Sequence, residues 1–389
     1  MGGLIVGMSM GMRGGFGLFV PPIALDRGWS REAIALALAW QNLAWGLAQP
    51  LFGAIADRFG AARVIAAGML VYALGLFTMA HAADSTGFTW STGLCVGLGL
   101  AGCAFGTVYG AVARLVPPER RGAALGITGA IGGLGQFLML PVLGGLITTT
   151  GWVTALVVMA MAFVVASLAA HSLRSPPSAA PVLPAERMRT AVAEALGQRD
   201  FWLLGLGFFT CGFQLSFVSF HLPAFLADHG FAVRTGTTAL ALITLANIGG
   251  IYACGRLGDR YRPRSVLTLL YLLRGAAFAA FIVLPLSEAS LYAFSIVMGL
   301  TWLGTVPLTN GVILRLYGAR YLSTLFGFVF VGHQLGGFGG AWVGGWAFDA
   351  TGSYAVVWWA CAALGLTAAA FHYPIDDTPR VPAGAAQPA

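Results

Sequence analysis

The chain has 389 residues, of which 58% are hydrophobic and only 9% are charged, whereas soluble proteins carry about 25% charged residues. This composition excludes a soluble globular protein and indicates an integral membrane protein. The net charge of +7 does not indicate nucleic-acid binding, because no soluble basic domain exists to carry it.

Apolar runs of helical length follow one another along the whole chain. A helix needs about 20 apolar residues to cross a bilayer, and counting such runs gives twelve. We therefore predict an all-α integral membrane protein with twelve transmembrane helices. The predicted spans are 2–24, 33–56, 63–83, 89–115, 121–148, 152–173, 201–227, 236–257, 264–285, 289–317, 321–349 and 353–373.

The positions of the arginines predict the orientation of these spans. Most arginines lie in even-numbered loops and the C-terminal tail. Arg27, Arg31 and Arg234 lie in odd-numbered loops, and Arg13 and Arg274 lie within spans. Because short cytoplasmic loops carry the excess of positive charge, we expect both termini in the cytoplasm.

The second half of the chain repeats the first. Identical residues recur 202 positions apart at Pro21/Pro223, Asp26/Asp228, Gly28/Gly230, Gly53/Gly255, Asp57/Asp259 and Arg58/Arg260. Each half has an even number of spans, so the two copies keep one orientation about an axis along the membrane normal. We predict two pseudo-symmetric six-helix bundles (1–173 and 201–373), a proline-rich cytoplasmic linker (174–200) and a cytoplasmic tail (374–389). A substrate site between such bundles can face each side in turn.

One charged loop motif occurs in each half, as GAIADRFG at 53–60 and GRLGDRYR at 255–262. It resembles the loop signature of the major facilitator superfamily, and with the twelve spans the resemblance covers essentially the whole chain. Glycine permits close helix approach, and the aspartate can pair with arginines or accept hydrogen bonds from a neighbouring helix end. We expect a latch that shuts the cytoplasmic side, formed by Gly53, Asp57, Arg58, Gly60, Arg63, Gly255, Asp259 and Arg260.

No carboxylate lies at mid-depth in any predicted span. Carriers of cations and proton-driven exporters usually need such a buried carboxylate. The deep ionisable groups are instead Arg13, Arg274 and His333, with His221 nearer the outer mouth. This positive field predicts an anionic substrate, since arginine can hold a carboxylate by two parallel hydrogen bonds.

Arg13 and His333 lie at similar depth, roughly 17 to 18 Å from the starts of their spans at 1.5 Å per residue. Both are expected to contact the substrate, and His333 and His221 can exchange a proton near neutral pH. The other expected substrate contacts are Gln334, Gln214, Asn247, Asn42, Gln136, Tyr109, His221 and Arg274. Each has a structural alternative, in which the side chain serves helix packing or backbone hydrogen bonds.

The segments RGGFGLFVPPIALDRGWSRE (13–32) and NLAWGLAQPLFGAIADRFG (42–60) resemble the branch of that superfamily with bacterial monocarboxylate carriers and the oxalate/formate exchanger. The resemblance implies an inner-membrane transporter of small organic acids, coupled to protons or working by exchange. The branch carries a substrate-binding arginine in span eight, one turn after the position of Asn247, where this chain has Ile251. Arg13 is the nearest replacement by depth.

Two other function classes remain as alternatives. An exporter of drugs or hydrophobic metabolites with the same fold is favoured by the aromatic spans and disfavoured by the missing carboxylate. An intramembrane enzyme is disfavoured because no catalytic constellation appears. The five cysteines show no paired spacing, so we expect no metal and no cofactor. The expected partners are an organic anion, protons and the lipid bilayer, with the chain acting as a monomer.

Overall fold

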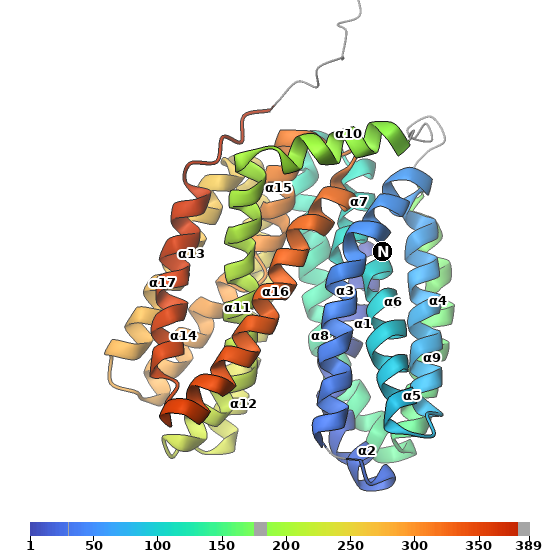
Figure 1. Ribbon diagram of the computed structural model, residues 1–389, viewed down its shortest axis with the longest axis vertical. Helices are drawn as coiled ribbons and strands as arrows, with labels where there is room; N and C mark the ends of the chain where they lie inside the picture. Colours follow the sequence, from blue (N-terminus) through green and yellow to red (C-terminus); the bar gives the residue numbers. More distant parts are fainter. Residues whose placement is uncertain (30, 175–184, 380–389) are drawn as a thin grey trace, which may run out of the picture.

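Two bundles of helices stand side by side along the long axis of the protein (Figure 1). The computed structural model describes residues 1–29, 31–174 and 185–379. Parts of the predicted linker (175–184) and of the predicted tail (380–389) lie outside these residues. Helix α10 (Ala185–Leu196) crosses one end of the molecule, which we call the linker end. Helix α2 lies at the opposite end, called here the α2 end.

The first bundle holds the first six predicted spans. A 3₁₀ turn at Phe16–Phe19 divides span one, and a π-helical segment at Trp90–Val96 lies within span four. The α-helices are α1 (Gly2–Gly15), α2 (Val20–Arg27), α3 (Arg31–Phe59), α4 (Ala61–Ala80), α5 (Ser85–Thr89), α6 (Gly97–Cys103), α7 (Phe105–Leu115), α8 (Arg121–Thr150) and α9 (Trp152–Ser167).

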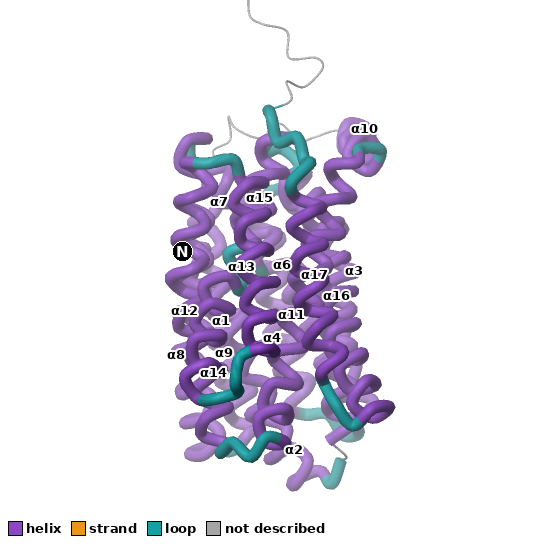
Figure 2. Tube along the Cα trace, turned by 90° about the vertical axis from the view of Figure 1, so that its left-hand side faces the viewer, coloured by secondary structure: helices purple, strands orange, loops and turns teal. Residues whose placement is uncertain are grey.

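The second bundle repeats this arrangement after α10. Figure 2 shows its helices also running along the long axis, with most loops near the two ends. Glycines Gly28 (φ 66°) and Gly352 (φ 68°) end α2 and α16 in the left-handed conformation, which glycine adopts at low cost. The α-helices are α11 (Arg199–Asp228), α12 (Val233–Arg260), α13 (Pro263–Val283), α14 (Glu288–Thr301), α15 (Thr305–Tyr317), α16 (Leu322–Thr351) and α17 (Ala355–His372).

The helices confirm the predicted all-α membrane fold. Ten segments of the described chain are long and apolar enough to cross a membrane. Helices α3 and α16, with 29 and 30 residues, correspond to the other two predicted spans.

Spans four and ten are interrupted at equivalent places, which the sequence reading treated as continuous. Ala104 takes an extended conformation between α6 and α7, and α14 ends at Thr301 before α15 begins at Thr305. Pro307 lacks an N–H and so cannot donate to the carbonyl four residues earlier. Each interruption frees backbone groups inside the protein, which side chains must satisfy.

Close contacts between α3 and α16 join the bundles at the linker end. A Cβ added at Gly327 would lie 2.6 Å from the Pro50 Cα, and one at Gly46 would lie 2.7 Å from the Gln334 Cβ. Helices α8 and α12 form a second seam, where a Cβ on Gly126 would lie 2.9 Å from the Gly255 Cα. Only glycine permits such approach, so these seams are tightly closed.

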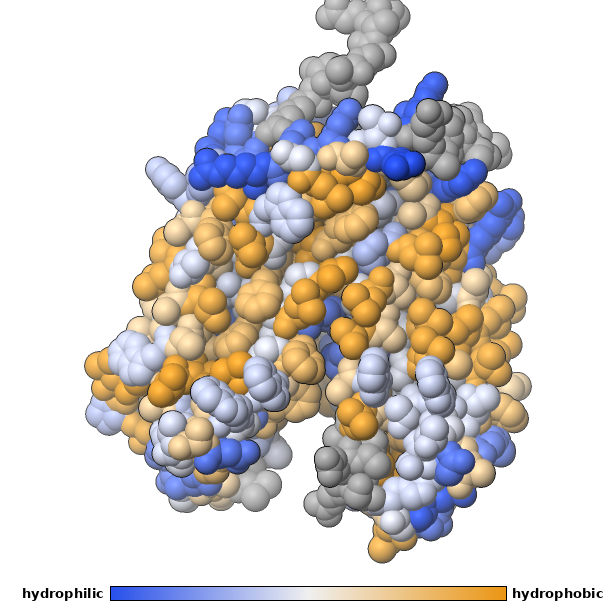
Figure 3. Space-filling model, in the orientation of Figure 1, coloured by the Kyte–Doolittle hydropathy of each residue, from blue (hydrophilic) through white to orange (hydrophobic). Residues whose placement is uncertain are grey.

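At the α2 end the bundles diverge. Figure 3 shows the surface hollowed between them, with the hollow opening toward the α2 end and narrowing toward the linker end. The structure is therefore closed at the linker end and open at the other.

Candidate substrate site and gate

Arg13 lies in the last turn of α1 and is half-buried. Its Nη2 and Nε atoms donate to the Asn42 Oδ1 on α3 at 2.6 and 3.2 Å, and its guanidinium lies 5.3 Å from the centre of the Trp45 ring. Among the described residues, no carboxylate forms an ion pair with Arg13. The guanidinium is therefore oriented by a neutral amide and an aromatic ring while its charge stays uncompensated.

A chain of hydrogen bonds leads from Arg13 across the seam to the second bundle. The Gln334 Nε2 on α16 donates to the Asn42 backbone carbonyl at 3.0 Å, and the Gln334 Oε1 lies 3.1 Å from the His333 Nδ1. Since an amide oxygen only accepts, the His333 Nδ1 must carry the hydrogen. Of the hydrogen bonds joining α3 and α16 in the described residues, the Asn42–Gln334 bond lies nearest the open end.

His333 is held by aromatic rings. Its ring stacks on Phe330 at 5.4 Å with an interplanar angle of 8°, and lies 4.7 Å from the Phe208 ring. Gln136 on α8 is half-buried, and its Nε2 lies 3.0 Å from where a Cβ on Gly14 would stand. Because Gly14 has no side chain, the Gln136 amide can lie against the backbone of α1 at the residue that follows Arg13. The structure brings Arg13, Asn42, Gln334 and His333 into one connected group, with Gln136 beside α1.

Arg274 and Gln214, by contrast, are completely enclosed, with 0% of their surface exposed. The Arg274 Nη2 donates to the carbonyls of Thr301 and Trp302, the latter at 2.9 Å. Its Nη1 donates to the Gln214 Oε1 at 3.3 Å, and the Gln214 Nε2 donates to the Cys361 carbonyl at 2.8 Å. These contacts give both residues a structural role at the interruption of span ten, so we leave them out of the proposed substrate site.

Asn247 and Tyr109 are also buried, with 3% and 0% exposed surface. The Asn247 Oδ1 accepts from the Leu303 N–H at 3.0 Å, a donor freed by the same interruption. The Tyr109 hydroxyl has no hydrogen-bond partner among the described residues and lies against Gly129 and Ile251 in the α8–α12 seam. Neither is open to a substrate in this conformation.

His221 lies within the second bundle. Its Nε2 is 2.8 Å from the Ala341 carbonyl on α16, and its ring lies 5.3 Å from Tyr354. This places it away from Arg13 and His333, between α11 and α16. Its expected part in substrate binding and proton coupling stays a prediction.

The first loop motif binds the opposite bundle. The Asp57 carboxylate accepts from the Thr324 N–H at 2.8 Å and from the Thr324 hydroxyl at 2.7 Å, at the start of α16. Its other oxygen accepts from the Arg114 Nη1 at 2.6 Å. Gly53 lets α3 approach, because a Cβ there would collide with the Ser323 carbonyl. A carboxylate at a helix start satisfies free N–H groups and the helix dipole.

The second loop motif, in the second bundle, binds the start of a helix in the first bundle. The Asp259 carboxylate accepts from the backbone N–H groups of Gly122 and Ala123, both at 2.6 Å, at the start of α8. Gly255 allows this approach, because a Cβ there would meet the Gly122 carbonyl. Each bundle therefore caps a helix of the other.

The remaining motif residues lie around these two contacts. Gly60 takes a positive φ of 99° at the turn into α4, and the Arg63 Nη1 donates to the Phe59 carbonyl at 3.4 Å. The guanidinium groups of Arg58 and Arg260 lie over the rings that follow them in sequence, at 5.0 and 5.6 Å. Their expected role in gating remains a prediction.

Sequence reasoning missed the partners of the two aspartates. Thr324 and Gly122 lie 202 residues apart, which is the same offset that relates Asp57 and Asp259. Applying the offset to the starts of the fifth and eleventh spans would have shown that these helix ends are equivalent. It also missed the contact of the Trp45 ring with the Arg13 guanidinium.

Comparison with known proteins assigns these features to a family. The model of the Major Facilitator Superfamily matches residues 2–341 and 240–388. The uncharacterized MFS-type transporter YcxA of Bacillus subtilis is 26% identical, covering 96% of this chain and 93% of YcxA. Human monocarboxylate transporter 11 is 28% identical over 90% of this chain and 76% of its own length. The multidrug resistance protein MdtH of Aeromonas salmonicida is 26% identical over 91% and 89%.

Solved structures agree on the fold. FucP, the fucose:proton symporter of Escherichia coli, in the outward conformation has a TM-score of 0.73 with 16% identity, covering 95% of this chain and 97% of FucP. The human organic anion transporter MFSD10 also has a TM-score of 0.73, with 18% identity and coverage of 95% and 97%. At these identities the likeness shows the fold alone.

Proposed function

Because the chain belongs to the Major Facilitator Superfamily, and so is a membrane transporter and not an enzyme, we propose that it carries a small organic anion, such as a monocarboxylate, by alternating access. The observation that carries the proposal is the uncompensated guanidinium of Arg13, half-buried and joined to the seam of the two bundles. A charge inside the membrane costs several kcal/mol and is normally retained for function. A carboxylate is the ligand that a guanidinium binds most specifically.

The two closed seams support the alternating-access part of the proposal. We assign the linker end to the cytoplasm of an inner-membrane protein, since most arginines lie there. The hollow in Figure 3 then faces outward, and the contacts of Asp57 and Asp259 hold the cytoplasmic side shut. Both contacts join the bundles, so both must break when the bundles rock to the inward-facing state. One chain holds the whole route, which makes a monomer the transporting unit.

Coupling to protons is supported by the chain of hydrogen bonds between Arg13 and His333. An imidazole is the side chain that most readily gains a proton near neutral pH. Protonation of His333 would add a second positive charge to the group that holds the anion. Anion binding and proton binding would therefore favour each other, as linkage requires.

The names of the relatives support two substrate classes. Monocarboxylate transporter 11 supports the organic anion, and MdtH supports the alternative of an efflux pump for drugs or hydrophobic metabolites. The positive charge of the site favours the organic anion. A cationic drug would meet Arg13 without a carboxylate at mid-depth, whereas an anion would find its counter-charge.

The proposal is tested by thermal unfolding of the purified protein with a panel of small mono- and dicarboxylates. The measurement is repeated at pH values on both sides of the ordinary histidine pKa of about 6.5. A ligand of the folded state stabilises it by about 2.7 kcal/mol at a hundred times its Kd, so a bound anion raises the melting temperature, and more so at the lower pH. A shift by neutral or cationic compounds alone would contradict the proposal.

Two variants at one contact test the site itself. Arg13→Ala should abolish the anion-induced shift while the protein still inserts. Asn42→Asp places a carboxylate where the Asn42 oxygen now lies 2.6 Å from the guanidinium, so it should occupy Arg13 and weaken anion binding about as strongly. Asn42→Leu is the control, because it removes the amide and keeps the positive charge. Unchanged anion binding by Arg13→Ala would refute the assignment.

A further inference from the structure

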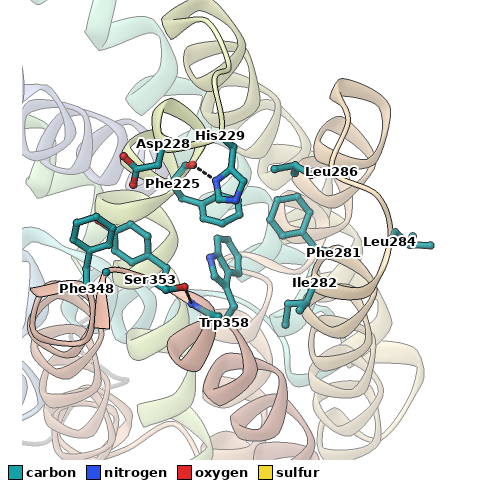
Figure 4. Close-up of a pocket in the computed structure, with 13 residues that line it drawn as sticks. Phe225, Asp228, His229, Phe281, Ile282, Leu284, Leu286, Phe348, Ser353 and Trp358 are labelled. Atoms are coloured by element: carbon teal, nitrogen blue, oxygen red, sulfur yellow. Dashed lines mark hydrogen bonds between the residues drawn. The ribbon is translucent and has the colours of Figure 1, made fainter. Parts of the chain in front are cut away.

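A pocket lies in the second bundle at the α2 end, outside the route between the bundles. Its volume is about 330 Å³, and it lies among the ends of α11, α13, α16 and α17. Its walls are largely aromatic, from Phe225, Phe281, Phe348, Tyr354 and Trp358. Figure 4 shows the rings of Phe225, Phe281, Phe348 and Trp358 around the pocket, with the Asp228 carboxylate at its edge.

The first bundle shows what the equivalent place holds. There the Arg27 guanidinium lies 5.4 Å from the centre of the Trp152 ring, and its Nε is 3.6 Å from the Asp26 carboxylate. The Trp152 Nε1 donates to the same carboxylate at 3.2 Å. A cation of the protein itself thus lies between an aromatic face and a carboxylate, an arrangement that attracts positive charge.

The duplication carries the aromatic ring and the carboxylate into the second bundle but leaves out the guanidinium. At the offset of 202, Asp26 corresponds to Asp228, Trp152 to Tyr354 and Arg27 to His229. The His229 ring turns back on its own helix, where its Nδ1 lies 2.7 Å from the Phe225 carbonyl and its ring 4.3 Å from the Phe225 ring. No arginine is among the described residues that line the pocket.

We propose that this pocket binds an organic ammonium ion from the outer side, with its charge against Asp228 and the aromatic faces. A second carboxylate, that of Asp349, directly follows Phe348 of the pocket wall on α16. Aromatic faces attract ammonium ions most strongly when water is excluded, and Trp358 is only 2% exposed. The occupant takes the place that Arg27 fills in the first bundle.

The Trp358 indole adds a second requirement. Its Nε1 is buried without a hydrogen-bond partner among the described residues, and a buried donor without a partner costs about 1–3 kcal/mol. An ammonium compound that also carries a hydroxyl or phosphate oxygen would satisfy it. Choline and ethanolamine head groups have this chemistry, either as free compounds or as parts of lipids. Leu284, which lines the pocket, is 54% exposed, so the pocket borders the outer surface of the bundle.

The test measures choline binding to the purified full-length protein by calorimetric titration at pH 8, where an ordinary histidine is neutral. The uncharged isostere 3,3-dimethylbutan-1-ol has the same shape and serves as the ligand control. We expect saturable binding of choline and at least tenfold weaker binding of the isostere. Asp228→Asn should weaken choline binding at least tenfold, and Trp358→Phe should weaken it less, since it removes the N–H and part of the indole but keeps an aromatic ring and the Asp228 charge.

Asp26→Asn is the matched protein control, because its site is already filled by Arg27, and it should bind choline as the wild type does. Equal binding of choline and the isostere, or equal effects of Asp228→Asn and Asp26→Asn, would overturn the proposal, as would no binding of choline or lipid.

Native mass spectrometry distinguishes a lipid head group from a soluble ammonium compound as the occupant. Phosphatidylethanolamine that is retained by the wild type and lost from Asp228→Asn identifies a lipid head group, while choline binding without retained lipid identifies a soluble cation. Arg13→Ala should leave all of these results unchanged, so they do not depend on the proposed transport.

Discussion

The two bundles each carry one arginine inside the spans, at positions that do not correspond. With the offset of 202, the position of Arg13 in the first bundle corresponds to that of Leu215 in the second, and the position of Arg274 corresponds to that of Tyr72 in the first. Arg13 is half-buried against one neutral amide. Arg274 is enclosed and donates to two backbone carbonyls at the interruption of α14 and α15. The same residue type thus serves a ligand site in our proposal for one bundle and the backbone in the other.

The interruptions themselves show why the bundles differ. In the first bundle the freed Ala101 carbonyl accepts from the Gln49 Nε2 at 3.1 Å and the Thr107 hydroxyl at 2.9 Å. In the second bundle a guanidinium, with five donors in a rigid fork, spans two freed carbonyls at once. The freed carbonyls are therefore hydrogen-bonded by neutral side chains in the first bundle and by a charged one in the second.

The largest expected effect concerns these buried groups. Arg274→Met removes the guanidinium that donates to the carbonyls of Thr301 and Trp302, and should lower the free energy of unfolding by about 3 kcal/mol. Tyr72→Phe, at the equivalent position, removes one hydroxyl that donates to the Ser9 carbonyl at 3.3 Å, and should cost about 1 kcal/mol. Equilibrium unfolding in detergent measures both. Equal losses would mean that the Arg274 guanidinium contributes no more to stability than the Tyr72 hydroxyl does.

A smaller effect is expected at the glycines of the two seams. In Gly53→Ala and Gly255→Ala the added methyl meets backbone atoms of the other bundle, at 2.8 Å from the Thr324 nitrogen and 2.5 Å from the Gly126 Cα. Overpacking of this kind costs about 2 kcal/mol, which shifts the population away from the state closed at the linker end about 30-fold. Spin-label distances across the linker end report this shift.

Gly144→Ala and Gly345→Ala are the matched controls for the seams, because a Cβ at either position meets no heavy atom within 4 Å. They should leave the distances unchanged. The two seams are expected to respond alike, so a shift in only one of the first two variants would show that one bundle contact dominates.

The smallest expected effect is the difference between the two aspartates. The Asp57 side chain is fully buried and holds both Arg114 and the start of α16, so Asp57→Asn should cost the closed state about 2 kcal/mol. Asp259 is exposed and caps α8 alone, so Asp259→Asn should cost about 1 kcal/mol. Hydrogen exchange at the amides of Thr324 and of Gly122 and Ala123 reads each contact directly. Faster exchange after Asp259→Asn than after Asp57→Asn would reverse the ranking.

Much of the fold could be predicted from sequence because membrane spans obey a simple length and polarity rule. The twelve apolar runs became the spans, and the repeated motif indicated the superfamily that the comparisons confirm. The candidate site was predicted less well. Depth along a helix placed Arg13 and His333 together, and the structure connects them through Asn42 and Gln334. The same reasoning could not separate Arg274 from them, because depth says nothing of which way a side chain turns.

Sequence by itself determined the membrane class, the duplicated architecture and the absence of any carboxylate at mid-depth, since hydropathy, offset and charge are local properties of the chain. Only the tertiary structure decided which polar groups are free. The interruptions at Ala104 and at Thr301–Thr305 create backbone donors and acceptors that no composition reveals. Those groups engage Arg274 and Asn247, whereas Arg13 stays half-buried and is the cation of the substrate site that we propose.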